Sequence, residues 1–247
     1  MPRASRRASF LVAGCLSLFA GGLVAPNPIA AQYSESSYFE TWTDIATIYN
    51  FSDRFRYDGD YGLRAALSTP DFTQIFLNPS ARYEAAPWLR LHAGIGWFHT
   101  FFPDTDDADE FRPWVGARIV GPRPAGFLIQ NYLRLEMRVF EFGGDRGGDT
   151  AWRGRWQLQV RSPDFRIGSA ERFYAVAFVE LFHTFDNEIE GFAAERVRLN
   201  LGLGRTFSRA WRMELNGMFQ HGRVEEGVTG FDLDEGIVRL RMFYTFN

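Results

Sequence analysis

The chain has 247 residues and a formal net charge of −3, with 27 basic and 30 acidic side chains. Its first 32 residues contain three arginines and no acid, which leaves 24 cations against 30 anions, a net charge of −6, in the remainder. This acidic balance argues against nucleic acid as a partner, because nucleic-acid binding usually needs a basic face. The length is compatible with a single β-barrel domain.

The N-terminus has the three parts of a secretory signal peptide. Three arginines precede an apolar run over residues 10–25, and small residues suited to cleavage follow in "PIAAQ". We therefore expect residues 1–32 to be removed, with the cut near Ala31 or Gln32, and residues 33–247 to form one domain.

Cys15 offers a second interpretation, because "LVAGC" resembles the lipobox of a lipoprotein. Only a short apolar segment precedes Cys15, and the apolar run continues well past this residue. Both features favour a cleaved signal peptide over lipidation. If Cys15 leaves with the signal, the rest of the chain has no cysteine, and neither a disulfide nor a thiolate metal site can form.

After residue 38, apolar and polar residues alternate in segments of about ten residues separated by turn residues. This alternation is typical of a transmembrane β-barrel, whose strands turn apolar side chains to lipid and polar side chains to the lumen. The faces of the segment "AVAFVEL" cannot be assigned, because both sides are apolar. In chain order, we predict strands over residues 39–50, 53–67, 73–84, 88–98, 111–119, 127–142, 152–161, 172–185, 196–203, 211–216 and 236–247.

The number of strands conflicts with a general rule. These segments number eleven, but single-chain bacterial barrels close with an even number of strands. We therefore expect about 10–12 strands, with either one strand undetected or residues 39–50 outside the wall.

The connections differ in length and charge, which predicts an orientation. Short turns occur at "FSDR", "AAP", "GPRPAG" and "FSRA", and longer polar loops at "PDTDDADE", "GGDRGGDT", "DNEIEGFAAE" and "GRVEEGVTGFDLDE". Bacterial outer-membrane barrels have short periplasmic turns and long external loops. The fold class that we expect is an all-β antiparallel transmembrane β-barrel with short periplasmic turns and longer acidic extracellular loops.

The polar face of the strands is rich in arginine. A charge that faces lipid costs about 2–4 kcal/mol at the bilayer midplane, so these side chains must face the lumen. Inward carboxylates can pair with neighbouring arginines, since the guanidinium fork matches a carboxylate. The lumen-facing candidates are Arg134, Glu136, Arg138, Arg155, Arg196, Arg198, Arg212, Glu214, Arg239 and Arg241.

Several stretches resemble one known family. They are "TWTDIATIYNFSDRF", "NYLRLEMRVFEF", "FVELFHTFDNE" and "ERVRLNLGLGRTFSRAWRMEL", in this order. They look like the domain-of-unknown-function 2490 family of predicted bacterial outer-membrane barrels, and the resemblance covers residues 40–247. It implies the fold and a location in the bacterial outer membrane, but supplies no activity and no functional residues.

Two interpretations of an arginine-rich lumen stay open. Barrels of eight strands are filled by side chains and those of sixteen hold a channel, so 10–12 strands lie between. The first interpretation is a filled or narrow barrel with a structural role in the envelope. The second is a small pore that prefers anionic solutes, since rings of arginine select anions.

A lipid-modifying enzyme is a further alternative that we do not favour. Outer-membrane phospholipases pair a histidine with a following serine, whereas Thr100 follows His99 and Thr184 follows His183. The two histidines lie beside Phe98, Phe101, Phe182 and Phe185, which suit the aromatic girdles at lipid interfaces. We expect no catalytic residue and no cofactor.

The acidic loops predict no metal site, because "DTDDADE" lacks the glycine and the spacing of an EF-hand loop. The partners that we expect are outer-membrane lipids and lipopolysaccharide, with small anionic solutes if the lumen conducts. During biogenesis we expect the barrel-assembly machinery to bind the last strand, where alternating apolar residues end in the aromatic Phe246.

Overall fold

The computed structural model describes residues 38–67, 72–103, 105–143, 147–185, 196–223 and 231–246. The predicted signal peptide, residues 1–32, lies outside these residues. The strands are β1 (Tyr38–Asn50), β2 (Phe55–Ala66), β3 (Thr73–Ala86), β4 (Leu89–Phe101), β5 (Ala108–Val120), β6 (Leu128–Phe142), β7 (Gly148–Arg161), β8 (Phe165–Ile167), β9 (Ala170–Thr184), β10 (Arg196–Thr206), β11 (Trp211–Arg223) and β12 (Phe231–Thr245).

One short 3-10 turn, η1 (Pro124–Gly126), precedes β6. Within the described ranges, no helix has the length and apolar character needed to cross a membrane.

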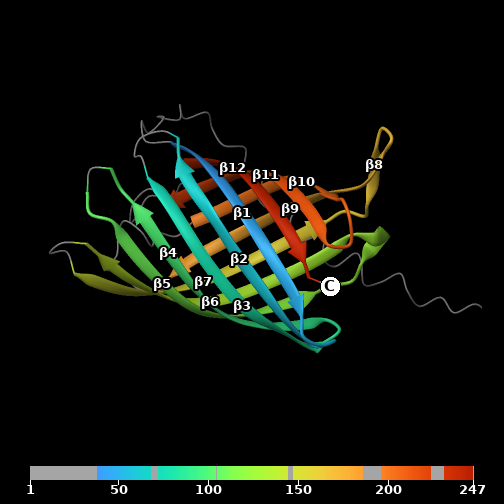
Figure 1. The fold of residues 1–247 in the computed structure, drawn as a ribbon, viewed down its shortest axis with the longest axis horizontal. Coiled ribbons are helices and arrows are strands. Elements are labelled where there is room, and N and C mark those ends of the chain that lie inside the picture. Colours follow the sequence, from blue (N-terminus) through green and yellow to red (C-terminus); the bar gives the residue numbers. More distant parts are fainter. Residues whose placement is uncertain are drawn as a thin grey trace, which may run out of the picture. The chain divides into compact units, whose positions relative to one another are not determined.

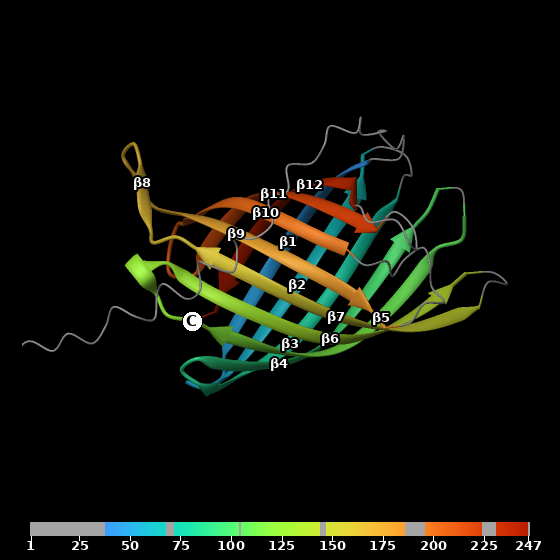
Figure 2. The same ribbon diagram turned by 180° about the vertical axis from the view of Figure 1, so that it is seen from behind.

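Eleven of the described strands form a closed wall around one interior (Figures 1 and 2). From β1 to β7, and on through β9, β10, β11 and β12, each strand pairs antiparallel with the next. β12 then pairs with β1 in parallel, from Tyr38 opposite Glu235 to Ile48 opposite Thr245. The short strand β8 pairs only with β9, and forms a hairpin with its first residues.

This closure corrects both alternatives offered for the strand count. Residues 39–50 are in the wall as β1, and eleven wall strands are enough to close it. With an odd number of strands in alternating directions, the first and the last run the same way. Two strands that run in the same direction can pair through a parallel ladder of evenly spaced, slanted hydrogen bonds. The first and last strands close the wall in this way.

The connections divide the barrel into two ends. The short-turn end holds residues 51–54, 87–88, 121–127 and 207–210, together with the β8 hairpin. At the acidic-loop end, β2 ends at Ala66, β4 at Phe101, β6 at Phe142, β9 at Thr184 and β11 at Arg223. Several predicted loops are partly strand, since β5 begins at Ala108 and β12 at Phe231.

The wall turns apolar side chains outward and charged side chains inward. In β6, Leu133 and Leu135 are 48% and 41% exposed, whereas Glu136 is fully covered. Successive residues of a strand point to opposite faces, so these charges lie in the interior. This pattern is the reverse of a soluble protein and is typical of a barrel surrounded by lipid.

The faces of β9, which the sequence leaves unassigned, are set by the interior. Val176, Phe182 and Glu180 are buried, whereas Leu181 is exposed. The inward face is apolar because Phe178 packs on a cluster of buried lumenal side chains. Apolar residues therefore occur on both sides of this strand: those on the outer face are exposed on the wall, and those on the inner face pack in the lumen.

Candidate functional site

All ten of the predicted lumenal residues project into the interior. Seven of them line its cavity, and these are Arg134, Arg155, Arg198, Arg212, Glu214, Arg239 and Arg241. Glu136 and Arg138 are buried beyond the cavity. Arg196 donates a hydrogen bond of 3.2 Å to Glu235.

A group of paired charges, the charged belt, lies on β5, β6 and β7. It consists of Glu110, Arg112, Glu136, Arg138 and Arg153. Arg112 donates to both oxygens of Glu110, at 2.8 and 2.7 Å, and Arg138 donates to the same two oxygens at 2.7 and 3.0 Å. Arg153 donates to Glu136. Each buried carboxylate therefore has charged hydrogen-bond partners, as burial of a charge requires.

The pairing continues around the wall beyond the belt. Arg155 Nη2 lies 2.6 Å from Glu180 and its Nη1 lies 3.5 Å from Glu136. Arg198 reaches Glu180 at 3.3 Å and donates to Gln220. The network thereby connects β6 through β7, β9 and β10 to β11.

Aromatic and aliphatic side chains fill the space beside the belt. This apolar plug consists of Trp42, Phe76, Phe98, Phe178, Phe182, Met218 and Ile237. Arginines lie over its rings, with Arg112 at 4.0 Å from the ring centre of Phe98 and Arg64 at 4.1 Å from that of Trp42. Cation–π contacts of this kind strengthen when water is excluded.

Sequence reasoning missed the apolar plug, and it assigned two of its members to the wrong face. Phe98 and Phe182 are buried in the lumen, whereas Phe101 and Phe185 are exposed as an interfacial girdle requires. The alternation along each strand could have identified their inward direction, because Phe98 falls on the same face as Arg90, and Phe182 on the same face as Glu180. Glycine also marks the inside, since a Cβ atom on Gly94 would lie 2.6 Å from the ring of Trp114.

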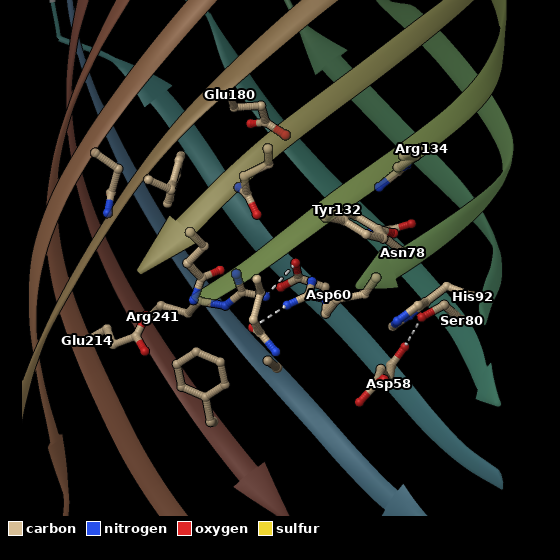
Figure 3. Close-up of a pocket in the computed structure, with 18 of the residues that line it drawn as sticks. Asp58, Asp60, Asn78, Ser80, His92, Tyr132, Arg134, Glu180, Glu214 and Arg241 are labelled. Carbon is tan, nitrogen blue, oxygen red and sulfur yellow. Dashed lines mark hydrogen bonds and ion pairs between the residues drawn. The ribbon is translucent and has the colours of Figure 1, made fainter. Parts of the chain in front are cut away.

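The interior holds a cavity of about 500 Å³ next to the belt and plug. Its lining includes thirteen arginines but only four carboxylates, Asp58, Asp60, Glu180 and Glu214. Figure 3 shows these carboxylates with Tyr132 and Arg134, projecting from β2, β6, β9 and β11 toward the same space. Arginines therefore dominate the lining, and several of them pair with carboxylates outside it, such as Asp44 and Glu110.

Neither histidine singled out in the sequence lies in this cavity. His99 lies on the outer face, where its Nδ1 is 2.9 Å from Asp109 and Asp109 also accepts a bond from the indole of Trp97. His183 packs edge-on against Phe185. Among the described residues, no group of three or more histidine, cysteine or acidic side chains is arranged to hold a metal ion.

A closed sheet with apolar side chains outward and paired charges inward defines an outer-membrane-type β-barrel. This chain belongs to the DUF2490 family, whose description is "protein of unknown function" and whose model matches residues 39–230. Among solved structures it is similar to the crystal structure of the beta domain of the Bordetella autotransporter BrkA. The identity is 11% and the TM-score 0.49, over 73% of this chain and 81% of that chain. No curated protein matches the sequence.

Proposed function

We propose that this protein is a bacterial outer-membrane β-barrel whose charged belt and apolar plug close the lumen, and that its role in the envelope is structural. The observation that carries this proposal is the burial of the belt. Glu110 and Glu136 are 6% and 0% exposed, and each is paired with arginine.

The energetics of the belt support a lumen that stays closed. Removing one partner of a buried ion pair costs about 3–5 kcal/mol, because the other charge is left unpaired in a region of low dielectric. A passage through the belt would have to separate several such pairs at once. The interlocked arginines over Phe98 and Phe182 would have to move with them.

Exposed aromatic side chains at both ends of the wall support the membrane setting. The band at the short-turn end contains Tyr49, Phe51, Phe55, Tyr83, Trp88, Phe127, Phe207, Trp211 and Phe246, and the band at the acidic-loop end contains Phe39, Phe101, Phe111, Trp152, Phe185 and Phe219. Exposed leucines such as Leu133 and Leu201 lie between the bands. Aromatic girdles that flank an apolar band are typical of transmembrane barrels.

In this proposal lipids cover the outer wall, lipopolysaccharide surrounds the acidic-loop end, and the barrel-assembly machinery inserts the chain. The short-turn end faces the periplasm. The proposal assigns no enzymatic activity, and purified barrel is expected to release no fatty acid from phospholipid or lipopolysaccharide. Release that is lost in a His99→Ala variant would contradict this part.

A second candidate function is a narrow pore for small anionic solutes. The excess of arginines over carboxylates in the cavity favours it. It would require the belt and plug to open.

A liposome assay separates the two candidate functions. Folded barrel is reconstituted into liposomes that are loaded with a small anionic dye, and a known porin serves as the positive control. The proposal predicts retention of the dye at the level of protein-free liposomes. Rapid efflux that depends on the amount of barrel would favour the pore.

A further inference from the structure

The cationic cavity reaches one mouth of the barrel. Its lining includes Arg56 and Arg90, each the second residue of its strand, and Arg161, the last residue of β7. All three positions are at the short-turn end. On β6 the lining stops at Arg134, well before the strand ends at Phe142, and on β4 it runs deeper and stops at Phe98 of the apolar plug. The cavity is thus a blind vestibule, open at the short turns and closed by the belt.

Side-chain exposure follows the same gradient. The side chains of Arg56, Arg90 and Arg161 are 24%, 25% and 27% exposed. Those of Arg112 and Arg138 in the belt are 8% and 6% exposed. Water therefore reaches the arginines at the mouth of the vestibule, whereas Arg112 and Arg138 in the belt are almost covered. A small solute could enter by the same route.

The vestibule wall on β2 to β5 places like charges opposite one another. Arg56 is the cross-strand partner of Arg82, and Arg90 is the partner of Arg118. Like charges in directly opposed positions destabilise a sheet. A barrel built only for stability would not be expected to keep two such pairs on adjacent strands, which suggests that this charge serves a ligand.

The carboxylates present do not neutralise this wall. Asp58 pairs with Arg56 at 2.8 Å, and Glu84 pairs with Arg90 at 2.9 Å and with Arg82 at 3.2 Å. Among the described residues, no ion pair within 4 Å joins Arg118 to a carboxylate, and Asp58 attracts it only from a longer distance.

Arg118 instead donates to Gln130 at 3.2 Å and lies over the ring of Tyr132. The Nε atoms of Arg56 and Arg118 and Nε2 of His92 are buried without a hydrogen-bond partner. Unpaired donors such as the two arginine Nε–H groups are costly, and an anion that draws these arginines inward would supply acceptors.

The opposite side of the vestibule adds a further cation without a carboxylate partner among the described residues. Arg212 on β11 lies 3.7 Å from the ring centre of Phe243. Arginine forks bind the oxygens of carboxylate and phosphate groups in pairs. Several forks around one space thus suit a ligand with several anionic oxygens.

We propose that this vestibule binds a small multivalent oxyanion, of the oligophosphate or polycarboxylate class, that enters from the short-turn end. Its volume of about 500 Å³ lies within the range of small-molecule sites. The site goes beyond the structural role proposed above and does not depend on conduction, since binding requires only the vestibule.

The test is calorimetric titration of the full chain, purified folded in detergent, with inorganic pyrophosphate and separately with citrate. We expect saturable binding of at least one anion, with an affinity that falls as salt is added because the contacts are charged. The double variant R56Q/R118Q should bind each anion at least about tenfold more weakly than the unmodified protein, because it loses charged hydrogen bonds. The variant R123Q, at an exposed position in a short turn, should bind like the unmodified protein.

Each outcome decides the proposal. Binding of pyrophosphate alone assigns the phosphate class, and binding of citrate alone assigns the carboxylate class. No saturable binding of either anion would overturn the proposal, as would equal binding by R56Q/R118Q. Ionic currents through the barrel would contradict the closed lumen but not the site, so the two proposals fail separately.

Folding of the variants is checked independently by the difference in gel mobility between boiled and unboiled samples. If the double variant does not fold, R118Q alone replaces it, because relief of the repulsion with Arg90 should offset the lost contacts with Gln130 and Tyr132. The bound anion should also raise the melting temperature of the unmodified protein but not that of R118Q.

Discussion

Arg239 in β12 donates two hydrogen bonds to the carboxylate of Asp44 in β1, at 2.5 and 2.8 Å, across the parallel seam that closes the barrel. The two residues are 195 positions apart in the chain. Arg241, the next inward residue of β12, lies 3.1 Å from the same carboxylate and 2.8 Å from Asp60 of β2. One buried acid therefore connects the last strand to the first, where an antiparallel partner is missing.

We expect Asp44→Asn to weaken this seam. Two arginines would lose the negative charge that they share, and breaking a buried ion pair costs about 3–5 kcal/mol. The measurement is the urea midpoint of unfolding in lipid vesicles, followed by tryptophan fluorescence. Glu171→Gln is the control, because its pair with Arg166 is largely exposed and should contribute at most about 1 kcal/mol. Equal midpoints for both variants would contradict a structural role of Asp44.

In the charged belt, we expect the removal of one charge to destabilise the barrel more than the replacement of all the paired charges by apolar residues. Glu110→Gln should cost about 3–5 kcal/mol, because Arg112 and Arg138 remain buried without their carboxylate. The triple variant E110L/R112M/R138L should recover most of this loss, since no unpaired charge remains. Unfolding in urea measures both. A triple variant less stable than E110Q would show that the belt contributes more than mutual neutralisation.

The apolar plug predicts that the lumen can be opened. The variant W42A/F98A removes two buried rings that lie against Arg64 and Arg112, and each ring costs about 3–5 kcal/mol of stability. Loss of the Phe98 ring also removes the surface on which Arg112 of the belt lies, so the belt should loosen together with the plug. If the protein still folds, we expect ionic currents that the unmodified barrel lacks. Phe101→Ala is the matched control, because this ring is exposed on the outer wall. Currents in the control variant would indicate a leak around the barrel rather than through it.

The membrane setting is tested on the outer wall. Leu201 lies near the middle of β10 and is 70% exposed, so Leu201→Arg should place a charge in the hydrocarbon region at a cost of about 2–4 kcal/mol. Folding efficiency into lipid vesicles is expected to fall, while Leu201→Val should fold normally. A soluble barrel would tolerate both changes, and unchanged folding of L201R would contradict a lipid-facing wall.

The sequence predicts much of this fold because each strand carries its own evidence. In β6 the alternation of Leu133 and Leu135 with Arg134 and Glu136 identifies both the strand and its inward face. The family model, which matches residues 39–230, confirms the resemblance seen in the motifs. An approximate strand count follows from these separate segments, and the observed eleven lies within the predicted 10–12.

The pairing of distant strands and their register could not be predicted from the sequence. The parallel pairing of β1 with β12 joins residues almost 200 positions apart, and no local pattern distinguishes it from an even-numbered closure. Likewise, the fork of Arg239 on Asp44 depends on the register between two strands rather than on parity.

The apolar plug was missed for a chemical reason. An aromatic residue such as Phe98 suits both a lipid interface and a cation–π contact in the lumen, so its residue type does not decide the face. The cavity could not be predicted either. Its position depends on the register of all the strands, which decides which inward side chains lie at the same level of the barrel.

The most direct test of a closed lumen is single-channel recording of the unmodified barrel in a planar bilayer. Folding is verified by the gel shift, and W42A/F98A is recorded under the same conditions. We expect no current steps above the protein-free baseline for the unmodified barrel. Stable steps with a reversal potential biased toward anions would contradict the closed lumen and identify a pore lined by the lumenal arginines.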